Sequence, residues 1–114
     1  MKRGEVWLIN LDPAVGAEIR KTRPAIIVND EAVGILPLKV IVPVTDWKEN
    51  YQVAPWMVKL EPEHQNGLNK VSAVDTFQVR SISKLRFSHK IGVLTDENMK
   101  AIEGALAAVL KIRE

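Results

Sequence analysis

Short apolar runs, most of them closed by turn residues, constrain the fold of this chain more than any other feature. The runs lie at residues 5–11, 24–28, 38–45, 56–60, 71–79 and 90–94. Breakers such as Asp12-Pro13, Asn29-Asp30 and Glu61-Pro62 follow three of them. Runs of this length with such boundaries are typical of β-strands. We therefore expect five or six short strands before residue 95.

Two features refine this prediction. Pro43 lies inside the third run, and proline has no N–H to donate to a strand ladder. We therefore expect that end of the strand to lie at a sheet edge or a bulge. Residues 61–70 contain Pro62, Asn66-Gly67 and Asn69 and are predicted to form a loop.

The period changes near the end of the sequence. Thr95 is a good N-cap, and the acidic residues Asp96 and Glu97 follow it, where the helix dipole favours negative charge. Apolar residues then recur at helical spacing, at Met99, Ile102, Leu106 and Val109. Lys111 and Arg113 are predicted to lie in the last turn. Strands followed by one amphipathic helix predict a mainly β fold, a small β-barrel closed by a C-terminal helix.

Composition limits the chemistry available. The 114 residues fit one domain across 1–114, and 46% hydrophobic residues can form a core. The absence of cysteine excludes disulfides, thiolate zinc sites and a cysteine nucleophile. No glycine-rich phosphate loop or G-x-S-x-G motif is present. His64 and His89 stand far apart and outside any metal-binding pattern, so we expect no metal and no cofactor.

The expected location is the cytoplasm. The first residues, Met1-Lys2-Arg3-Gly4-Glu5, become charged again before an apolar segment of a signal peptide can form. No apolar run approaches the roughly 20 residues that a membrane helix needs.

Basic residues gather in two stretches of this nearly neutral chain. The net charge is +2, and residues 20–23 and 80–86 together hold six of the sixteen lysines and arginines. Such stretches are either solvated loops or contacts for the phosphates of a nucleic acid. The charge pattern alone leaves both alternatives open.

Three ordered segments resemble the MazF/PemK family of toxins. The first runs from Arg3-Gly4-Glu5-Val6-Trp7 through Asp12-Pro13 and Gly16-Ala17-Glu18 to Arg23-Pro24, and is similar to that family's opening strand, D-P corner and loop ending in R-P. The second, residues 40–45, ends in Pro43-Val44-Thr45 and is similar to the family's P-x-T strand. The third, residues 75–82, contains Gln78-Val79-Arg80-Ser81-Ile82 and is similar to its Q-x-R-[ST]-[IL] segment. Their order and spacing match from about residue 3 to residue 112.

This resemblance implies an SH3-like β-barrel with a C-terminal helix, assembled as a homodimer and inhibited by a cognate antitoxin. It further implies a metal-independent endoribonuclease that cuts single-stranded messenger RNA at short motifs. In that reaction the 2′-hydroxyl attacks the adjacent phosphate and leaves a 2′,3′-cyclic phosphate and a 5′-hydroxyl. Carried over by position, Arg23 and Thr45 are the catalytic candidates, with Glu18 as a third.

The residue types suit that reaction. In-line attack builds negative charge on phosphorus, and the guanidinium of Arg23 offers several fixed donors to neutralise it. Arg23 precedes Pro24, which favours an extended backbone, and Thr45 offers a hydroxyl donor. Because arginine is a poor base at its usual pKa, we favour an electrostatic role for Arg23. Glu18 is either a base or a residue that holds the loop and contacts RNA.

The first loop departs from the family pattern. Some PemK relatives carry a histidine directly after the loop glycine, but this sequence has Ala17 there, so a histidine-assisted mechanism does not transfer. The usual loop glycines are replaced by the bulkier, more basic residues 19–22. We expect this loop to differ from its relatives in mobility and base preference.

RNA binding is predicted for residues on both sides of the catalytic pair. Arg20, Lys21 and Arg80 are candidates for phosphate contacts, and Trp47 or Trp56 for stacking on unpaired bases. Two other candidates are Asp46, beside Thr45, and Gln78, which either bonds a base edge or caps a turn. We expect Trp7 to belong to the core.

Two other functions remain open from the residues alone. One is a gyrase-poisoning toxin of the CcdB kind, which shares the fold, although this sequence lacks the Trp-Gly-Ile ending associated with CcdB. The other is a non-catalytic SH3-like module that binds peptide or nucleic acid and needs neither Arg23 nor Thr45 for catalysis.

Overall fold

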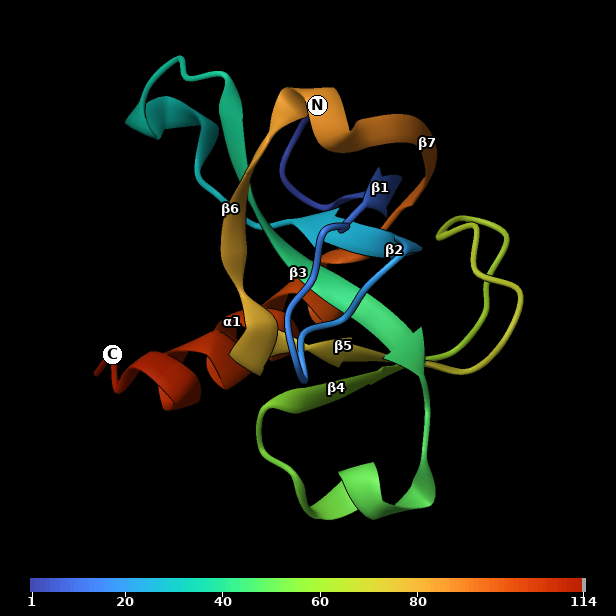
Figure 1. Ribbon diagram of the computed structural model, residues 1–114. Helices are drawn as coiled ribbons and strands as arrows, with labels where there is room; N and C mark the ends of the chain where they lie inside the picture. Colours follow the sequence, from blue (N-terminus) through green and yellow to red (C-terminus); the bar gives the residue numbers. More distant parts are fainter. Residues whose placement is uncertain (114) are drawn as a thin grey trace.

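The computed structural model describes residues 1–113, which form a bent antiparallel sheet and one long helix (Figure 1). The strands are β1 (Glu5–Asn10), β2 (Thr22–Ile27), β3 (Leu38–Asp46), β4 (Met57–Leu60), β5 (Ser72–Asp75), β6 (Arg80–Ser83) and β7 (Phe87–Val93). The helices are the 3-10 segments η1 (Glu31–Val33), η2 (Glu49–Val53), η3 (Thr76–Gln78) and η4 (Lys84–Arg86), and the helix α1 (Asp96–Leu110).

Strand β3 organises the sheet. The order is β4-β5-β3-β2-β1-β7, and β6 also pairs with β3, so β3 contacts three strands, all antiparallel. Within residues 1–113 no backbone pairing joins β4 to β7, so the barrel-like sheet is not strictly closed. The predicted mainly β fold with a C-terminal helix is confirmed.

Both faces of the central strands are buried. Ala25 and Ile27 pack into one apolar cluster, whereas Ile26 and Val28 pack into another that includes residues of α1. Successive strand residues point to opposite faces, so a strand with a core on each side needs apolar residues throughout. This is why residues 24–28 are apolar without alternation.

Helix α1 covers one of these clusters. Met99 and Ile102 are buried in it, and the Thr95 Oγ1 accepts a hydrogen bond from the Asn98 N–H at 3.1 Å. The predicted N-cap and apolar stripe are therefore confirmed. The prediction for the last turn is wrong: α1 ends at Leu110, and Lys111 is the C-cap with a left-handed φ of 57°. No helix in residues 1–113 is long and apolar enough to cross a membrane.

The prediction of a continuous strand over residues 71–79 is also wrong. The Asp75 carboxylate accepts a hydrogen bond from the Phe77 N–H at 3.1 Å, which ends β5 and turns the chain into η3. A separate strand, β6, then begins at Arg80 within the basic stretch, and β7 begins at Phe87 instead of residue 90. The apolar residues of segment 71–79 favour one strand, but the side-chain cap at Asp75 ends it early.

Pro43 lies in the middle of the sheet, contrary to the expectation of an edge or bulge. It pairs with Ala25 of β2 on one side of β3. On the other side, β6 pairs with residues 38–41 and β5 with residues 44–46. Pro43 therefore lies where one neighbour gives way to the next, and its missing N–H removes no ladder bond there.

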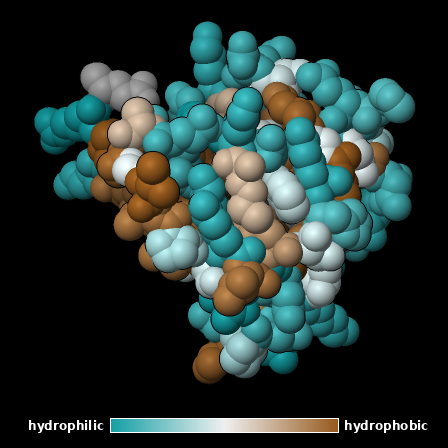
Figure 2. Space-filling view, turned by 90° about the horizontal axis from the view of Figure 1, so that it is seen from above, coloured by the Kyte–Doolittle hydropathy of each residue, from teal (hydrophilic) through white to brown (hydrophobic). Residues whose placement is uncertain are grey.

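Apolar side chains remain exposed on η1 and the segment after it. Ile35 is 98% exposed, and Val33 and Leu36 are also exposed. The view from above shows apolar groups gathered on the surface of the molecule (Figure 2). Exposed apolar patches of this kind commonly mark contacts with other macromolecules.

A buried carboxylate stabilises the N-terminal end of the sheet. Burial alone raises the pKa of Glu5, but hydrogen bonds from the Lys2 N–H, the Trp7 Nε1–H and the Lys90 ammonium outweigh it. The two Oε1 bonds, from Lys2 and Trp7, measure 3.0 and 2.9 Å, and Lys90 Nζ lies 3.3 Å from Oε2. Together they lower the pKa of Glu5 to about 2.

We predict that Glu5→Gln lowers the free energy of unfolding by about 2 kcal/mol at pH 7. Because the folded-state pKa is depressed, this stabilisation is fully present above the ordinary value of 4.5 and is lost as the pH falls through about 2. Urea unfolding of both proteins between pH 2 and 7 measures the difference. A difference that stays constant with pH, or that appears equally in the exposed-site control Glu63→Gln, contradicts the prediction.

Candidate active site

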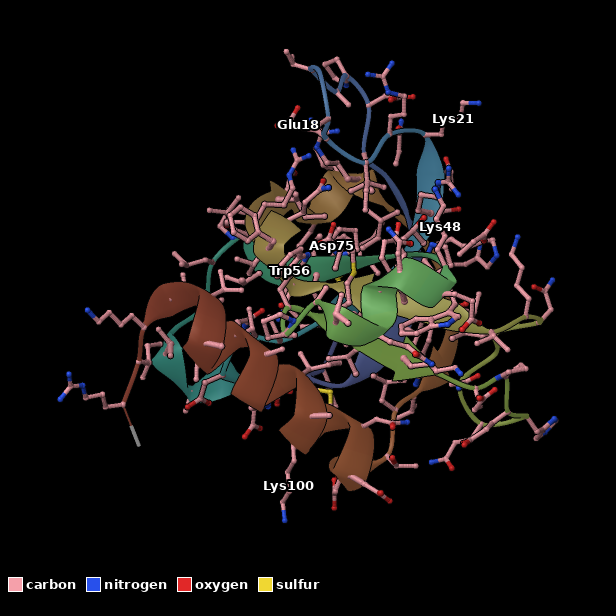
Figure 3. All side chains as sticks on the ribbon, turned by 90° about the horizontal axis from the view of Figure 1, so that it is seen from below. Glu18, Lys21, Lys48, Trp56, Asp75 and Lys100 are labelled. Atoms are coloured by element: carbon pink, nitrogen blue, oxygen red, sulfur yellow. The ribbon has the colours of Figure 1, made fainter. Side chains whose placement is uncertain are left out.

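The loop between β1 and β2 is anchored at its base by backbone and side-chain contacts. The Leu11 N–H donates to the Lys21 carbonyl at 2.9 Å, and the Lys21 N–H donates to the Asp12 carboxylate at 3.0 Å. The Arg86 guanidinium donates to the carbonyls of Asn10 and Asp12. Figure 3 shows the loop projecting from the barrel, with Glu18 and Lys21 on it, away from α1. The basic residues of this loop are therefore presented by a defined turn.

Lys21 adopts a backbone conformation that normally favours glycine, with φ at 69°. Its two backbone hydrogen bonds at the loop base hold it there. The sequence analysis found that bulkier residues replace the usual glycines in this segment, and the structure places one of them in a strained conformation. The loop thus keeps a glycine-type turn with a basic side chain on it.

Arg23 and Thr45 line one cleft of about 330 Å³, which we name the Arg23 groove. Its wall includes Thr22, Arg23, Val44, Thr45, Asp46 and Lys70. The β2–β3 pairing ends at Ala25 and Pro43, two residues from Arg23 on β2 and from Thr45 on β3. The fold therefore brings together the two residues that the sequence predicted as a catalytic pair; their roles stay predictions.

The charge in the Arg23 groove comes from several segments. Asp46 accepts a hydrogen bond from the Lys70 ammonium at 2.9 Å, and this bond, with the nearby charges of Arg23 and Lys48, lowers the pKa of Asp46. Asp46 and Lys70 thus form an exposed ion pair at the groove wall. Sequence reasoning missed Lys70 because it lies in the loop before β5, far from Arg23 along the chain.

A second cleft, of about 540 Å³, is lined by three other predicted residues, Glu18, Gln78 and Arg80. We name it the Gln78 groove, and its lining includes Leu11, Glu18, Ile19, Pro43, Phe77, Gln78, Val79 and Arg80. Glu18 therefore lines a different cleft from Arg23 and Thr45. One Glu18 oxygen accepts a hydrogen bond from the Val15 N–H at 2.6 Å, so this carboxylate holds its own loop.

Gln78 joins this loop to the barrel. Its Oε1 accepts from the Ile19 N–H at 2.7 Å, and its Nε2 donates to the Asp75 carboxylate at 3.1 Å and to the Ala17 carbonyl at 3.4 Å. Asp75 is almost fully buried, and burial raises its pKa despite the hydrogen bonds it accepts from Phe77 and Gln78. Sequence reasoning missed Asp75, whose only signal was its place three residues before Gln78, at the start of the third family segment.

The remaining predicted RNA-binding residues lie outside both grooves. Arg20 and Lys21 are exposed on the projecting loop, where Arg20 Nη2 donates to the Gly16 carbonyl at 3.1 Å. The Arg23 Nε lies 3.4 Å from the Arg20 carbonyl and donates to it weakly. The loop therefore places these cations beside the Arg23 groove without enclosing it.

The three tryptophans differ in how they are packed. Trp7 is partly buried and makes an edge contact with Phe87, so it packs against one apolar cluster at the border of the core in which it was predicted. Trp47 is partly buried, with Tyr51 at its ring edge and the Lys59 ammonium 5.1 Å from its centroid. Trp56 is exposed and makes an edge contact with Phe77. Of the two predicted stacking candidates, Trp56 is therefore the more accessible.

Within the described residues 1–113, the histidines and acidic residues form no candidate metal site. His64 and His89 are both exposed. Among residues 1–113, no group of three or more histidine, aspartate or glutamate side chains lies where it could hold an ion.

Comparison with known proteins decides the family. The family model described as the PemK-like, MazF-like toxin of type II toxin-antitoxin systems matches residues 2–110. The chain belongs to this toxin family. Endoribonuclease PemK of Escherichia coli is 33% identical to this family member over 112 residues, covering 96% of this chain and 82% of PemK.

Solved structures agree with the fold of this family member. MazF of Deinococcus radiodurans superposes with a TM-score of 0.81 at 25% identity, covering 98% of this chain and 97% of that one. The Mycobacterium tuberculosis toxin MazF-mt6 has a TM-score of 0.77 at 22% identity, over 96% and 99% of the two chains. A mycobacterial endoribonuclease in complex with its cognate antitoxin has a TM-score of 0.76 at 22% identity, over 98% and 96%.

We predict that Gln78→Ala loosens the loop between β1 and β2. Loss of one neutral hydrogen bond is worth about 1 kcal/mol, so amide exchange at Ile19 accelerates about fivefold, measured by NMR. Ser81→Ala, on the neighbouring β6, is the matched control and leaves this exchange unchanged.

Gln78→Glu places a second carboxylate beside Asp75. The two carboxylates repel at neutral pH but can share a proton in acid, so this variant recovers protection of Ile19 as the pH falls. Equal protection in the wild-type protein and Gln78→Ala shows that the bond does not hold the loop.

Proposed function

We propose that this protein is the toxin of a toxin-antitoxin pair and a metal-independent endoribonuclease that cuts single-stranded messenger RNA at short sequence motifs. Membership of the toxin family and the likeness to endoribonuclease PemK support this proposal. The observation that carries it is that Arg23 and Thr45 line the same groove. We further propose a single cytoplasmic domain over residues 1–114 that acts as a homodimer.

The proposed reaction is an internal transfer at one phosphate. The ribose 2′-oxygen loses its proton and bonds to the adjacent phosphorus, while the bond from phosphorus to the 5′-oxygen breaks. The departing 5′-oxygen takes up a proton, which leaves a 2′,3′-cyclic phosphate and a 5′-hydroxyl. Negative charge builds on the non-bridging oxygens during this step, so donors placed there lower the barrier.

Arg23 and Thr45 supply such donors in this proposal. The guanidinium of Arg23 neutralises charge on the phosphate, and the Thr45 hydroxyl donates to another of its oxygens. Lys70, held by Asp46 at 2.9 Å, adds positive charge at the groove wall. Glu18 has a positioning role, because it lines the other cleft and its carboxylate holds its own loop.

The basic loop extends this groove along the RNA. Arg20 and Lys21 are exposed beside it and contact neighbouring phosphates in the proposal. Arg80, which lines the Gln78 groove, is proposed to contact a phosphate on the other side. Gln78 itself binds the protein backbone and Asp75, so we assign it to loop positioning and not to base recognition.

We predict that the purified protein cuts a long single-stranded RNA in EDTA at discrete positions. The new ends carry a 5′-hydroxyl, which accepts phosphate from a kinase without prior dephosphorylation. Arg23→Ala and Thr45→Ala each reduce the cleavage rate by about 100-fold or more, the usual effect of removing a donor to a developing oxyanion. The rates are measured from gel-resolved fragments under single-turnover conditions.

The controls separate chemistry from folding and from bulk charge. Thr45→Ser keeps the hydroxyl and most of the rate, and Lys100→Ala removes a distant exposed cation from α1 (Figure 3) with little effect. Discrete cutting that survives Arg23→Ala refutes the assigned mechanism. A folded protein that cuts no RNA favours the gyrase-poisoning or binding-module alternative.

The proposed protein partner is a cognate antitoxin with an acidic segment. One structure with the same fold contains an endoribonuclease with its cognate antitoxin, and the exposed cations Arg20 and Lys21 suit an acidic peptide. We predict binding that weakens as salt rises from 50 to 500 mM, because exposed charges are screened. Calorimetric titration measures it, and Arg20→Ala flattens the salt dependence; affinity that does not change with salt contradicts this interface.

A further inference from the structure

The Gln78 groove has the size and lining of a site for a flat, partly apolar ligand. Its volume is about 540 Å³, within the usual range for small-ligand clefts. Leu11, Ile19, Pro43 and Val79 give it apolar walls, and Glu18 and Arg80 add polar groups. An unpaired nucleobase combines an apolar face with polar edges, as this lining requires.

Phe77 offers an exposed aromatic face at this groove. Its side chain is 67% exposed although it is a large apolar residue. Its backbone is fixed, because the Phe77 N–H donates to Asp75 at 3.1 Å and the preceding Thr76 donates twice to the Trp56 carbonyl, at 3.1 and 2.6 Å. The Trp56 ring meets the Phe77 ring edge to face, with centroids 6.2 Å apart. Such a held, exposed ring is suited to stacking on a base.

Strand β3 links this groove to the proposed reaction site. Pro43 lines the Gln78 groove, and Thr45 lines the Arg23 groove two residues further along. Residues i and i+2 share a face of a strand and lie about 7 Å apart. This is the scale of one nucleotide step in an extended single strand, so a phosphate at Thr45 places a neighbouring base near Pro43.

We propose that the Gln78 groove binds the unpaired nucleobase next to the scissile phosphate and that Phe77 stacks on that base. This inference rests on the proposed endoribonuclease function and names one determinant of its sequence specificity. Arg80, in the groove lining, pairs with the backbone of the same nucleotide. The Gln78 side-chain amide is already hydrogen-bonded to Ile19 and Asp75. The base is therefore selected by the shape of the groove and by stacking on Phe77, more than by hydrogen bonds from this amide.

The test uses a short RNA that spans a cleavage site mapped with the wild-type protein. A 2′-deoxy residue at the cleavage position removes the attacking hydroxyl, so that binding is measured without cutting. Fluorescence anisotropy then gives Kd for this RNA and for a set in which each position in turn lacks its base. Phe77→Ala is expected to weaken binding of the complete RNA about tenfold or more. Leu85→Ala is the matched control, since Leu85 is 95% exposed and lines neither groove.

The decisive result is a lack of additivity at one position. Removing the base beside the scissile phosphate weakens wild-type binding as much as Phe77→Ala weakens binding of the complete RNA. Phe77→Ala then has no further effect on the RNA that lacks this base. Phe77→Tyr keeps a stacking ring and restores most of the affinity. Unchanged affinity of Phe77→Ala for the complete RNA overturns the inference. So does a Phe77→Ala variant that loses the same affinity for every abasic RNA, or one whose weaker binding is explained by a changed oligomeric mass.

Failure of this inference can be distinguished from failure of the proposed function. If the wild-type protein cuts RNA but Phe77→Ala binds it equally well, the nuclease assignment stands and the base site is wrong. If the wild-type protein cuts no RNA and no site can be mapped, binding is measured on a random single-stranded RNA. Weaker binding by Phe77→Ala than by Leu85→Ala then keeps the base site and shows that the nuclease assignment is wrong. A Tm of Phe77→Ala equal to that of the wild-type protein establishes that the variant is folded.

Discussion

The pairing of β3 with three other strands is the constraint on which the rest of this structure depends. β2 lies along one side of β3, while β6 and β5 share its other side, the first near residues 38–41 and the second near 44–46. Pro43 is compatible with this arrangement because it lies between the two partners. The same strand carries Thr45 into the Arg23 groove and Pro43 into the Gln78 groove. One strand thus fixes the spacing between the proposed reaction site and the proposed base site.

Polar side chains then hold the loop between β1 and β2 in a defined shape. The loop between β1 and β2 is exposed and rich in cations, yet Asp12, Arg86 and Gln78 bind its backbone at separate points. Asp75 supports Gln78 from inside the protein, at the cost of an ionisable group in a poorly solvated place. Such a network holds the loop more firmly than its exposure suggests. The same network holds Lys21 at a positive φ, a conformation that glycine usually adopts.

The structure divides the residues that the sequence analysis treated as one site. Arg23, Thr45 and Asp46 line one cleft, whereas Glu18, Gln78 and Arg80 line another. Glu18 and Gln78 both accept hydrogen bonds from the protein backbone, so each holds the loop, and their roles toward RNA stay predictions. Of the missed residues, Asp75 had only its place in the third family segment as a signal, and Lys70 had none beyond its charge, because Lys70 meets Asp46 from a distant part of the chain. The comparisons place the chain in the toxin family but leave the role of each of these residues to experiment.

What the sequence by itself determined was local. Apolar runs and breakers predicted most strands, and Thr95 with the stripe from Met99 predicted the helix, because these patterns depend on neighbouring residues alone. The ordered motifs also predicted Arg23 and Thr45 as a pair. Only the tertiary structure decided that these two residues line one groove, that Asp75 ends β5, and that the other predicted residues line a second groove. Strand register and side-chain capping across the fold bring together residues far apart along the chain, and no local pattern records those contacts.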